Sequence, residues 1–241
     1  MKATLTLLSA FLIALSGAQS KPLPGKMDEF YFHAANIDLL QAKPVQKEIG
    51  VTEAQRKRMN GFADTHRGRL KTLEEQYKKA NKDPREAPKD PKVIAYFYEL
   101  KINVMRTLQP GQLKRLGEIS LQQIGLAALT DEVVAKKIGM SKAQLDKMRV
   151  AFNAGGTKYA AAEGAAATPI MEKYKNKNVK NQKEAEAMQK QFNAELQAAM
   201  KKATPNLVSI RNAAEKNMKA ILTSAQMAKY QALLGRKFNP A

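Results

Sequence analysis

The five-residue stretch LTSAQ (residues 222–226) is the full copy of a phrase that occurs four times in this chain. Looser copies are VTEAQ (51–55), LQPGQ (108–112) and MSKAQ (140–144). Three copies place a Thr or Ser three residues before a Gln, which is the spacing of a capping box at a helix N-terminus. These pairs are Thr52 with Gln55, Ser141 with Gln144, and Thr223 with Gln226. We interpret these six residues as helix caps, which fix where long helices begin, and not as ligand contacts.

Residues beside the phrases favour the same interpretation. Gly50 precedes the first copy and suits the left-handed position just after a helix. In LQPGQ the cap position holds Gln109, a poor N-cap, while Pro110 suits the first helical position. Losing one cap typically costs about 1 kcal/mol of stability.

Apolar residues recur every three or four positions along most of the chain, which predicts an all-α fold. Residues 52–80 form one long amphipathic helix by this criterion. Further helices are expected near 110–125, 131–138, 142–163, 182–202, 205–221 and from 223 to about 235. We expect a break in the alanine-rich segment 161–169, and a helix restart at Thr204, as N-cap, before Pro205.

Two segments carry patterns other than that of an amphipathic helix alone. Residues 81–92 contain three prolines and dense charge, so a loop is expected there. Residues 98–104 alternate apolar and polar side chains as a strand does, but they also fit one helical face. A lone strand would leave its backbone groups unpaired, and no partner strand is evident, so we predict a helix.

The chain repeats internally. Residues 40–59 align with 129–148 at an offset of 89, and residues 107–116 align with 221–230. The four phrases are therefore two openings and two closings, which indicates two tandem units at 34–122 and 123–241. We expect an extended cradle, a monomeric pseudo-dimer folded from one polypeptide.

The N-terminus has the layout of a secretory signal peptide at residues 1–18. A positive start is followed by a short apolar run and by the small residues SGA, with cleavage expected after Ala18. Residues 19–33 would then be a linker. The chain contains no cysteine. We expect a periplasmic or secreted protein with no integral membrane segment and no disulfide.

The charge is strongly biased: 41 Lys and Arg stand against 22 Asp and Glu, for a net charge of +19. Such a surface attracts anionic partners over long range. The candidates are acidic or unfolded proteins, nucleic acid without sequence readout, anionic lipid and cell-wall polymer. Because lysine supplies most of the charge, fixed bidentate recognition is disfavoured.

Catalytic and metal-binding patterns are not found. The only histidines are His33 and His66, and His66 lies on an apolar stripe, so we expect it to be packed. No cysteine and no histidine pair offers transition-metal ligand spacing. The GG pair at 155–156 lacks the rest of a phosphate loop. We expect no enzyme activity, no cofactor and no metal site.

The phrases resemble the LTxxQ motif that exported helical proteins of the Spy/CpxP group carry near the start and near the end of the chain. LTSAQ matches fully, VTEAQRKRM (51–59) looks like the opening helix of that family, and MAKYQALL (227–234) looks like its closing helix. MSKAQ and LQPGQ are degenerate copies. The resemblance implies two Spy-like units in tandem and an ATP-independent chaperone or envelope-stress protein. No family motif marks client-binding residues, so those remain unknown.

Three functions follow as alternatives. The first is a chaperone-like protein that holds unfolded or aggregation-prone envelope proteins on a basic and apolar helical surface. The second is a polyanion binder. The third is an envelope-stress signalling partner or scaffold that docks on a sensor domain.

Overall fold

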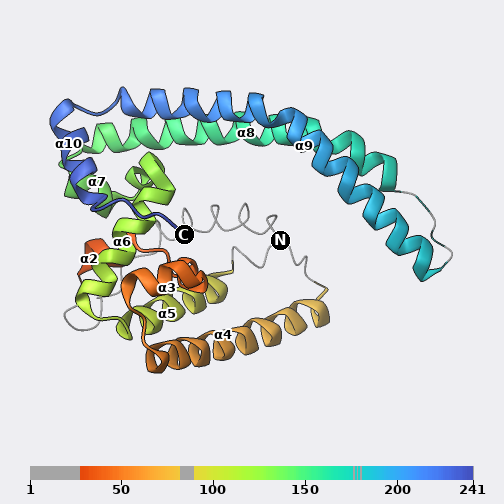
Figure 1. The fold of residues 1–241 in the computed structure, drawn as a ribbon, viewed down its shortest axis with the longest axis horizontal. Coiled ribbons are helices and arrows are strands. Elements are labelled where there is room, and N and C mark those ends of the chain that lie inside the picture. The colour runs from red at the N-terminus through yellow and green to blue at the C-terminus, as the bar shows by residue number, and fades with distance from the viewer. Residues whose placement is uncertain (1–27, 82–89, 176, 178, 180, 241) are drawn as a thin grey trace. The chain divides into compact units, whose positions relative to one another are not determined.

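The computed structural model describes residues 28–81, 90–175, 177, 179 and 181–240 (Figure 1). Within those residues the chain forms helices and no strand, which confirms the all-α prediction. The predicted signal peptide at 1–18, most of the predicted linker at 19–33 and most of the predicted loop at 81–92 lie outside the described residues. Residues 98–104 are helical, as predicted, and belong to α5 (Pro91–Arg106).

The chain divides into two compact units whose boundaries differ from the expected division at 122/123. Unit 1 comprises Met1–Met140 with Ala225–Ala241, and unit 2 is Ser141–Ser224. Unit 2 is therefore an insertion between two parts of unit 1. The boundary expected from the repeat falls inside unit 1, within the helix Pro110–Ile124.

Unit 1 is built from helices of 5 to 27 residues around an apolar core. In chain order its elements are α2 (Glu29–Ala34), η2 (Ile37–Gln41), α3 (Lys43–Ile49), α4 (Glu53–Lys79), α5, α6 (Pro110–Ile124), η4 (Gly125–Thr130), α7 (Glu132–Lys137) and α10 (Ser224–Leu233). Helix α6 is central, since it packs against α2, α3 and η4. Its Leu116, Ile119 and Leu121 side chains are fully buried. Burial of such side chains supplies the main stabilisation of unit 1.

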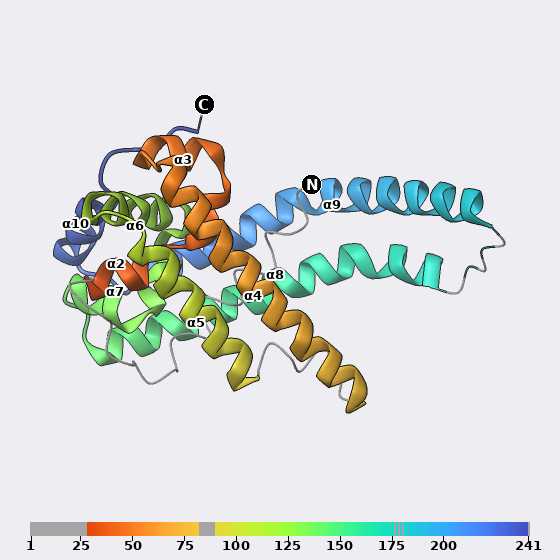
Figure 2. The same cartoon turned by 90° about the horizontal axis from the view of Figure 1, so that it is seen from below.

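Helices α4 and α5 form an antiparallel pair, visible in both views (Figures 1 and 2). Helix α4 starts after Thr52, as predicted. Far from the main core the pair is held by a small apolar cluster of Leu73, Tyr77 and Val93. His66 is packed there, as predicted: its ring lies edge-on to Phe97 with centroids 4.5 Å apart.

Unit 2 is a hairpin of two long helices, α8 (Lys142–Lys175) and α9 (Gln182–Lys219). Helix α8 buries three side chains along 34 residues, and α9 buries two along 38. The helices approach closely at Gly155, where an added Cβ would lie 2.6 Å from the Cβ of Ala214. Gly155 therefore permits a close helix crossing.

Two predicted breaks were wrong. Helix α8 runs through the alanine-rich segment and through Pro169, and α9 runs through Pro205. Thr204 is not an N-cap, because its Oγ1 donates to the carbonyl of Met200 one turn earlier. Both prolines are exposed, so the carbonyl that each leaves unpaired can be hydrated. Packing of α8 along α9 then stabilises each helix beyond its local stop signals.

The elements repeat in the same order. Elements η2, α3, α4, α5 and α6 correspond in sequence position to η4, α7, α8, α9 and α10. Gly50 and Gly139, which align, both adopt the left-handed conformation with φ of 68° and 80°. The aligned apolar residues are buried in both copies: Leu40 and Leu129, Val45 and Val134, Ile49 and Ile138, Met59 and Met148. The sequence repeat is thus a repeat of core positions.

Across the described residues no helix is long and apolar enough to cross a membrane. This agrees with the expectation that the chain contains no integral membrane segment within those ranges.

Adjacent glycines of α8 provide a matched test of the close crossing. Gly155→Ala should lower the free energy of unfolding by about 1–3 kcal/mol, because the methyl group collides with Ala214. Gly156→Ala should raise it by about 0.5–1 kcal/mol, because nothing lies within 4 Å of its added Cβ and alanine favours the helix. Urea unfolding followed by circular dichroism measures both. Equal stabilisation by the two variants would contradict the close crossing.

Candidate functional site

The predicted cap residues lie at the starts of α4, α8 and α10. The Oγ1 of Thr52 accepts from the N–H of Gln55 (3.2 Å), and Gln55 Oε1 accepts from the N–H of Thr52 (3.0 Å). Ser141 and Gln144 make the same two bonds at 3.2 and 3.0 Å. Thr223 immediately precedes α10, and Gln226 lies in the first turn of that helix and is buried.

The glutamines of the first two phrases also bind each other. Gln55 Nε2 donates to the carbonyl of Thr107 (2.6 Å), just before the LQPGQ phrase. Gln112 Nε2 donates to the carbonyl of Gly50 (2.7 Å), just before the VTEAQ phrase. The two carboxamides are hydrogen-bonded to each other at 2.7 Å. Each glutamine therefore caps its own helix and satisfies a carbonyl of the loop before the other helix.

The other two phrases contain equivalent bonds. Gln144 Nε2 donates to the carbonyl of Ile221 (3.0 Å), and Gln226 Nε2 donates to the carbonyl of Gly139 (2.8 Å). In the repeat alignment Ile221 corresponds to Thr107, and Gly139 corresponds to Gly50. We call these four side-chain-to-carbonyl bonds the reciprocal glutamine bonds. They give the phrase a structural role.

A second group of polar residues lies within unit 1, where buried Lys101 is surrounded by half-buried partners that the sequence pattern did not indicate. Lys101 of α5 is 7% exposed, and its Nζ lies 4.9 Å from the ring centroid of Phe32. His33 Nδ1 lies 2.9 Å from Oδ2 of Asp131, the N-cap of α7. Asp131 also accepts from the N–H groups of Val133 and Val134. The only sequence signal was a lysine on an otherwise apolar helical face.

Burial acts on the pKa values of Lys101, Asp38 and Asp131. Burial lowers the pKa of Lys101 to about 8, although the nearby charges of Asp131 and Asp38 act in the opposite direction. Burial raises the pKa of Asp38, against the effect of Lys101. For Asp131 burial is again the largest single effect and acts upward, but the bonds from His33 and from the helix N-terminus together hold its pKa below the usual value. The group is a partly buried set of charges that joins α2, α5 and α7.

Unit 2 presents the surface most suited to binding another molecule. Of the described residues, four large hydrophobic side chains are exposed, and all four belong to unit 2: Val150 (69%), Met171 (48%), Val179 (38%) and Val208 (38%). The same segment carries 15 Lys and Arg against 7 Asp and Glu, a net charge of +8. We call this the hairpin surface. It combines apolar side chains with a positive field.

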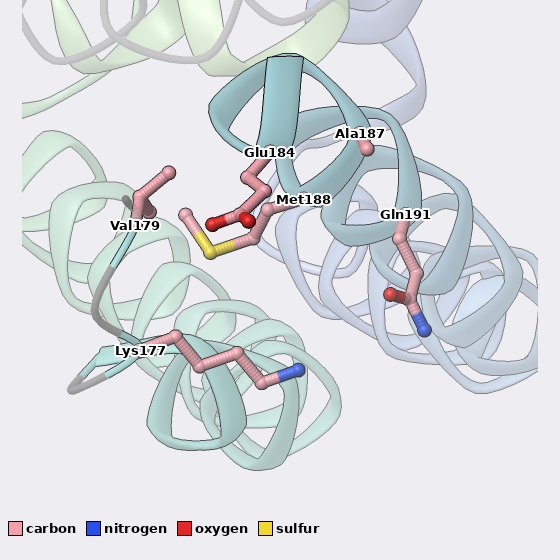
Figure 3. A pocket seen from close by; sticks show the side chains of 6 residues that line it. All are labelled: Lys177, Val179, Glu184, Ala187, Met188 and Gln191. Atoms are coloured by element: carbon pink, nitrogen blue, oxygen red, sulfur yellow. The ribbon is translucent and has the colours of Figure 1, made fainter. Parts of the chain in front are cut away.

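The tip of the hairpin contains a shallow hollow (Figure 3). Glu184, Met188 and Gln191 line it from α9, and Lys177 and Val179 line it from the connection between the helices. Lys177 also lies over the ring of Tyr174, 4.3 Å from the centroid. The Tyr174 hydroxyl donates to Glu195 (3.0 Å), which accepts from Lys173 as well. The hollow is mixed in polarity and holds no catalytic constellation.

In the described ranges no group of three or more His, Cys, Asp or Glu side chains is placed to hold a metal ion. His66 Nε2 is buried and has no hydrogen-bond partner among the described residues. Burial is the largest cause of the lowered pKa of His66, followed by the charge of Arg69, so the ring stays neutral. A neutral packed ring agrees with a structural role.

Comparison with known proteins gives no match: no family model, no curated protein and no solved structure is similar to this chain. What the fold and the surface define is therefore an all-α class of protein with a charged, partly apolar helical hairpin.

The reciprocal glutamine bonds can be tested by a double-mutant cycle. Gln55→Ala or Gln112→Ala should each lower the free energy of unfolding by about 1–2 kcal/mol, because each removes the side-chain partner of a loop carbonyl and of a cap N–H. The double variant should cost less than the sum, because the two side chains also bind each other. Gln189→Ala, on an exposed part of α9, is the control and should change stability by a few tenths of a kcal/mol at most. Strict additivity would contradict the coupling.

The buried lysine predicts a specific pH dependence. Because the pKa of Lys101 is lower in the folded chain than in the unfolded chain, the unfolded state binds more protons between pH 8 and about 10.4. The free energy of unfolding of the native protein should therefore rise by about 2–3 kcal/mol over that range, relative to Lys101→Met. Urea unfolding at several pH values measures the difference. If the difference in free energy of unfolding between the native protein and Lys101→Met stays constant with pH, burial does not lower the pKa of Lys101 and the prediction is wrong.

Proposed function

We propose that this protein is an exported, ATP-independent, chaperone-like binding protein that holds unfolded or aggregation-prone envelope proteins. The observation that carries the proposal is the hairpin surface, where exposed Val150, Met171 and Val208 stand on a segment of net charge +8. Scattered apolar side chains on a positive surface suit weak and varied contacts with unfolded chains, since such chains expose apolar groups. Acidic clients would in addition be attracted over long range.

The tandem organisation belongs to the same proposal. The repeated element order and the equivalent glutamine bonds support two related sequence repeats in one chain. Each repeat contains a helical hairpin, α4 with α5 in the first and α8 with α9 in the second. In the proposal the second hairpin has become the binding element, since it is longer and its exposed surface is more apolar. The protein acts as a monomeric pseudo-dimer and performs no catalysis.

Lysine enrichment keeps polyanion binding as a second candidate. Unit 2 contains 13 Lys and 2 Arg, and lysine gives affinity for phosphates without selecting a geometry. A nucleic acid, an anionic lipid or a cell-wall polymer would then bind with a steep dependence on salt. The exposed apolar side chains have no role in that function, which allows the two candidates to be separated.

The chaperone proposal predicts suppression of client aggregation without ATP. At equimolar amounts the protein should slow the light scattering of several chemically denatured clients as they are diluted. The triple variant Val150→Ser, Met171→Ser and Val208→Ser should be at least twofold less effective, because it removes apolar contact area and keeps every charge. The matched control is Ala154→Ser, Ala165→Ser and Ala198→Ser, which places serines at exposed alanines on the same two helices. The control should behave like the native protein.

Two results would reject the chaperone proposal. One is that aggregation of all clients is unchanged by the native protein. The other is that the native protein binds an oligonucleotide with a steep dependence on salt, and the triple serine variant binds it equally well. In this second case neither protein slows the aggregation of clients. That second result would favour the polyanion binder.

A further inference from the structure

Two contacts fix the register of the antiparallel helices α8 and α9. Gly155 lies against Ala214, and farther toward the tip of the hairpin the Tyr174 hydroxyl donates to Glu195 (3.0 Å). Because the helices are antiparallel, each residue forward along α8 is matched by one residue back along α9. Both contacts give the same register, since the step from Gly155 to Tyr174 equals the step from Glu195 to Ala214.

This register brings the two prolines inside the hairpin helices to one level of unit 2. Nine residues from the first contact, Pro205 of α9 lies level with Gly164 of α8. Five residues from the second contact, Pro169 of α8 lies level with Met200 of α9. We call the stretch of the hairpin between these two pairs of residues the proline level. No spacing within either helix indicates that the two prolines share it.

The backbone of both helices is weakened at the proline level. Proline has no N–H group, so neither Pro169 nor Pro205 can donate to the carbonyl one turn earlier, and each ring crowds that carbonyl. The Oγ1 of Thr204 donates to the carbonyl of Met200 (2.9 Å), a type of bond that often bends helices. Prolines are among the main causes of sharp helix bends. Both helices change direction together partway along the hairpin (Figure 1).

Large buried side chains flank the proline level and do not lie within it. All residues of α8 and α9 are described, and the two helices bury five side chains: Leu145, Met148, Tyr174, Leu207 and Met218. All five lie outside the proline level, where α8 supplies mostly alanines. A segment with few buried apolar contacts deforms at low free-energy cost. Neither the backbone nor the packing therefore holds the two helices straight at this level.

We propose that the proline level is a hinge that crosses both helices of the hairpin. Beyond it lies the distal arm, residues 170–175 and 181–199, which swings relative to the close crossing of the helices. The arm moves as a pair, because Tyr174 bonds to Glu195 and its ring packs edge-on against Phe192 with centroids 5.4 Å apart. Hinges of this kind need only a few residues that absorb the change of backbone angle.

The use of the hinge in binding rests on the proposed chaperone function. Exposed apolar side chains lie on both sides of the proline level, with Met171 in the distal arm and Val150 and Val208 on the other side. Bending changes the spacing between these side chains and leaves the charge of the hairpin surface unchanged. Binding surfaces that accept many partners rely on such adaptability. The hinge thus lets one surface fit clients of different shape.

The first experiment measures the motion itself. The chain contains no cysteine, so pairs of introduced cysteines can carry spin labels at exposed positions. Lys190→Cys with Asn212→Cys places the labels on α9 on either side of the proline level. The control, Lys147→Cys with Ser209→Cys, places both labels on the same side. In pulsed electron paramagnetic resonance the distance distribution of the first pair should be at least twice as wide as that of the control pair. Equal widths would overturn the proposal.

Replacing the prolines tests whether they form the hinge. Pro169→Ala with Pro205→Ala restores the two missing N–H donors, and alanine favours the helix, so the variant should fold with full helicity by circular dichroism. It should narrow the distribution of the Lys190→Cys, Asn212→Cys pair to the width of the control pair. Gly156→Ala lies outside the proline level, its added Cβ meets nothing, and it should leave the width unchanged. If the double alanine variant keeps the full width, the prolines are not the hinge and the proposal is wrong.

The role in client binding is measured separately by light scattering. The double alanine variant should be at least twofold less effective than the native protein against at least one of several clients, because its hairpin keeps one curvature. If it protects every client as well as the native protein does, the hinge has no role in client binding. If the native protein protects no client, the proposed chaperone function fails, whereas the distance distributions still decide whether the hinge exists.

Discussion

The structure depends on how the glutamines of the four phrases satisfy backbone groups. A helix start leaves free N–H groups, and the loop before it leaves free carbonyls. Gln55 serves both needs, because its oxygen caps α4 while its nitrogen binds the carbonyl of Thr107. Gln112 makes the complementary bonds. A carboxamide, with an acceptor and two donors at one end of a flexible stem, can do this where a hydroxyl or carboxylate cannot. The starts of α4 and α6 are thereby held together.

Two long helices alone cannot enclose a core, and unit 2 shows the consequence. Where α8 and α9 cross closely at Gly155, small side chains fill the interface, so few large side chains are buried. Large apolar residues such as Val150 then remain exposed to water. Because α8 and α9 form only a pair, part of the surface of the hairpin is apolar, and the lysines give the same surface a positive charge. The proposed binding function therefore follows from the shape of the hairpin and does not require any single residue.

Buried charges connect parts of unit 1 that are distant in sequence. Lys101 faces Asp131 and Asp38, and Arg115 joins Glu48 to the carbonyl of Arg236. Removing the acidic partners would leave Lys101 or Arg115, which are buried, without compensating charge, and this costs more than the interaction contributes. These residues therefore favour one arrangement of α2, α3, α5, α6 and α7 over alternatives with the same apolar contacts. Arg115 extends this constraint to the segment that follows α10, through the carbonyl of Arg236.

The sequence by itself determined the all-α class, the start of α4 at Thr52, the packing of His66 and the repeat of core positions, because apolar spacing and capping are local patterns. It did not predict the continuity of α8 and α9 through Pro169 and Pro205, since packing between the two helices outweighs a local stop signal. The unit boundaries at 140/141 and 224/225, the burial of Lys101 beside Asp131 and the packing of residues 234–238 on α6 were also decided only by the tertiary structure. Each of these features depends on contacts between residues that are far apart in the chain, as Glu48 and Arg236 are. No spacing along the sequence relates such residues. A local pattern specifies a helix and its cap, whereas long-range burial decides which helices share a core and which faces stay in water.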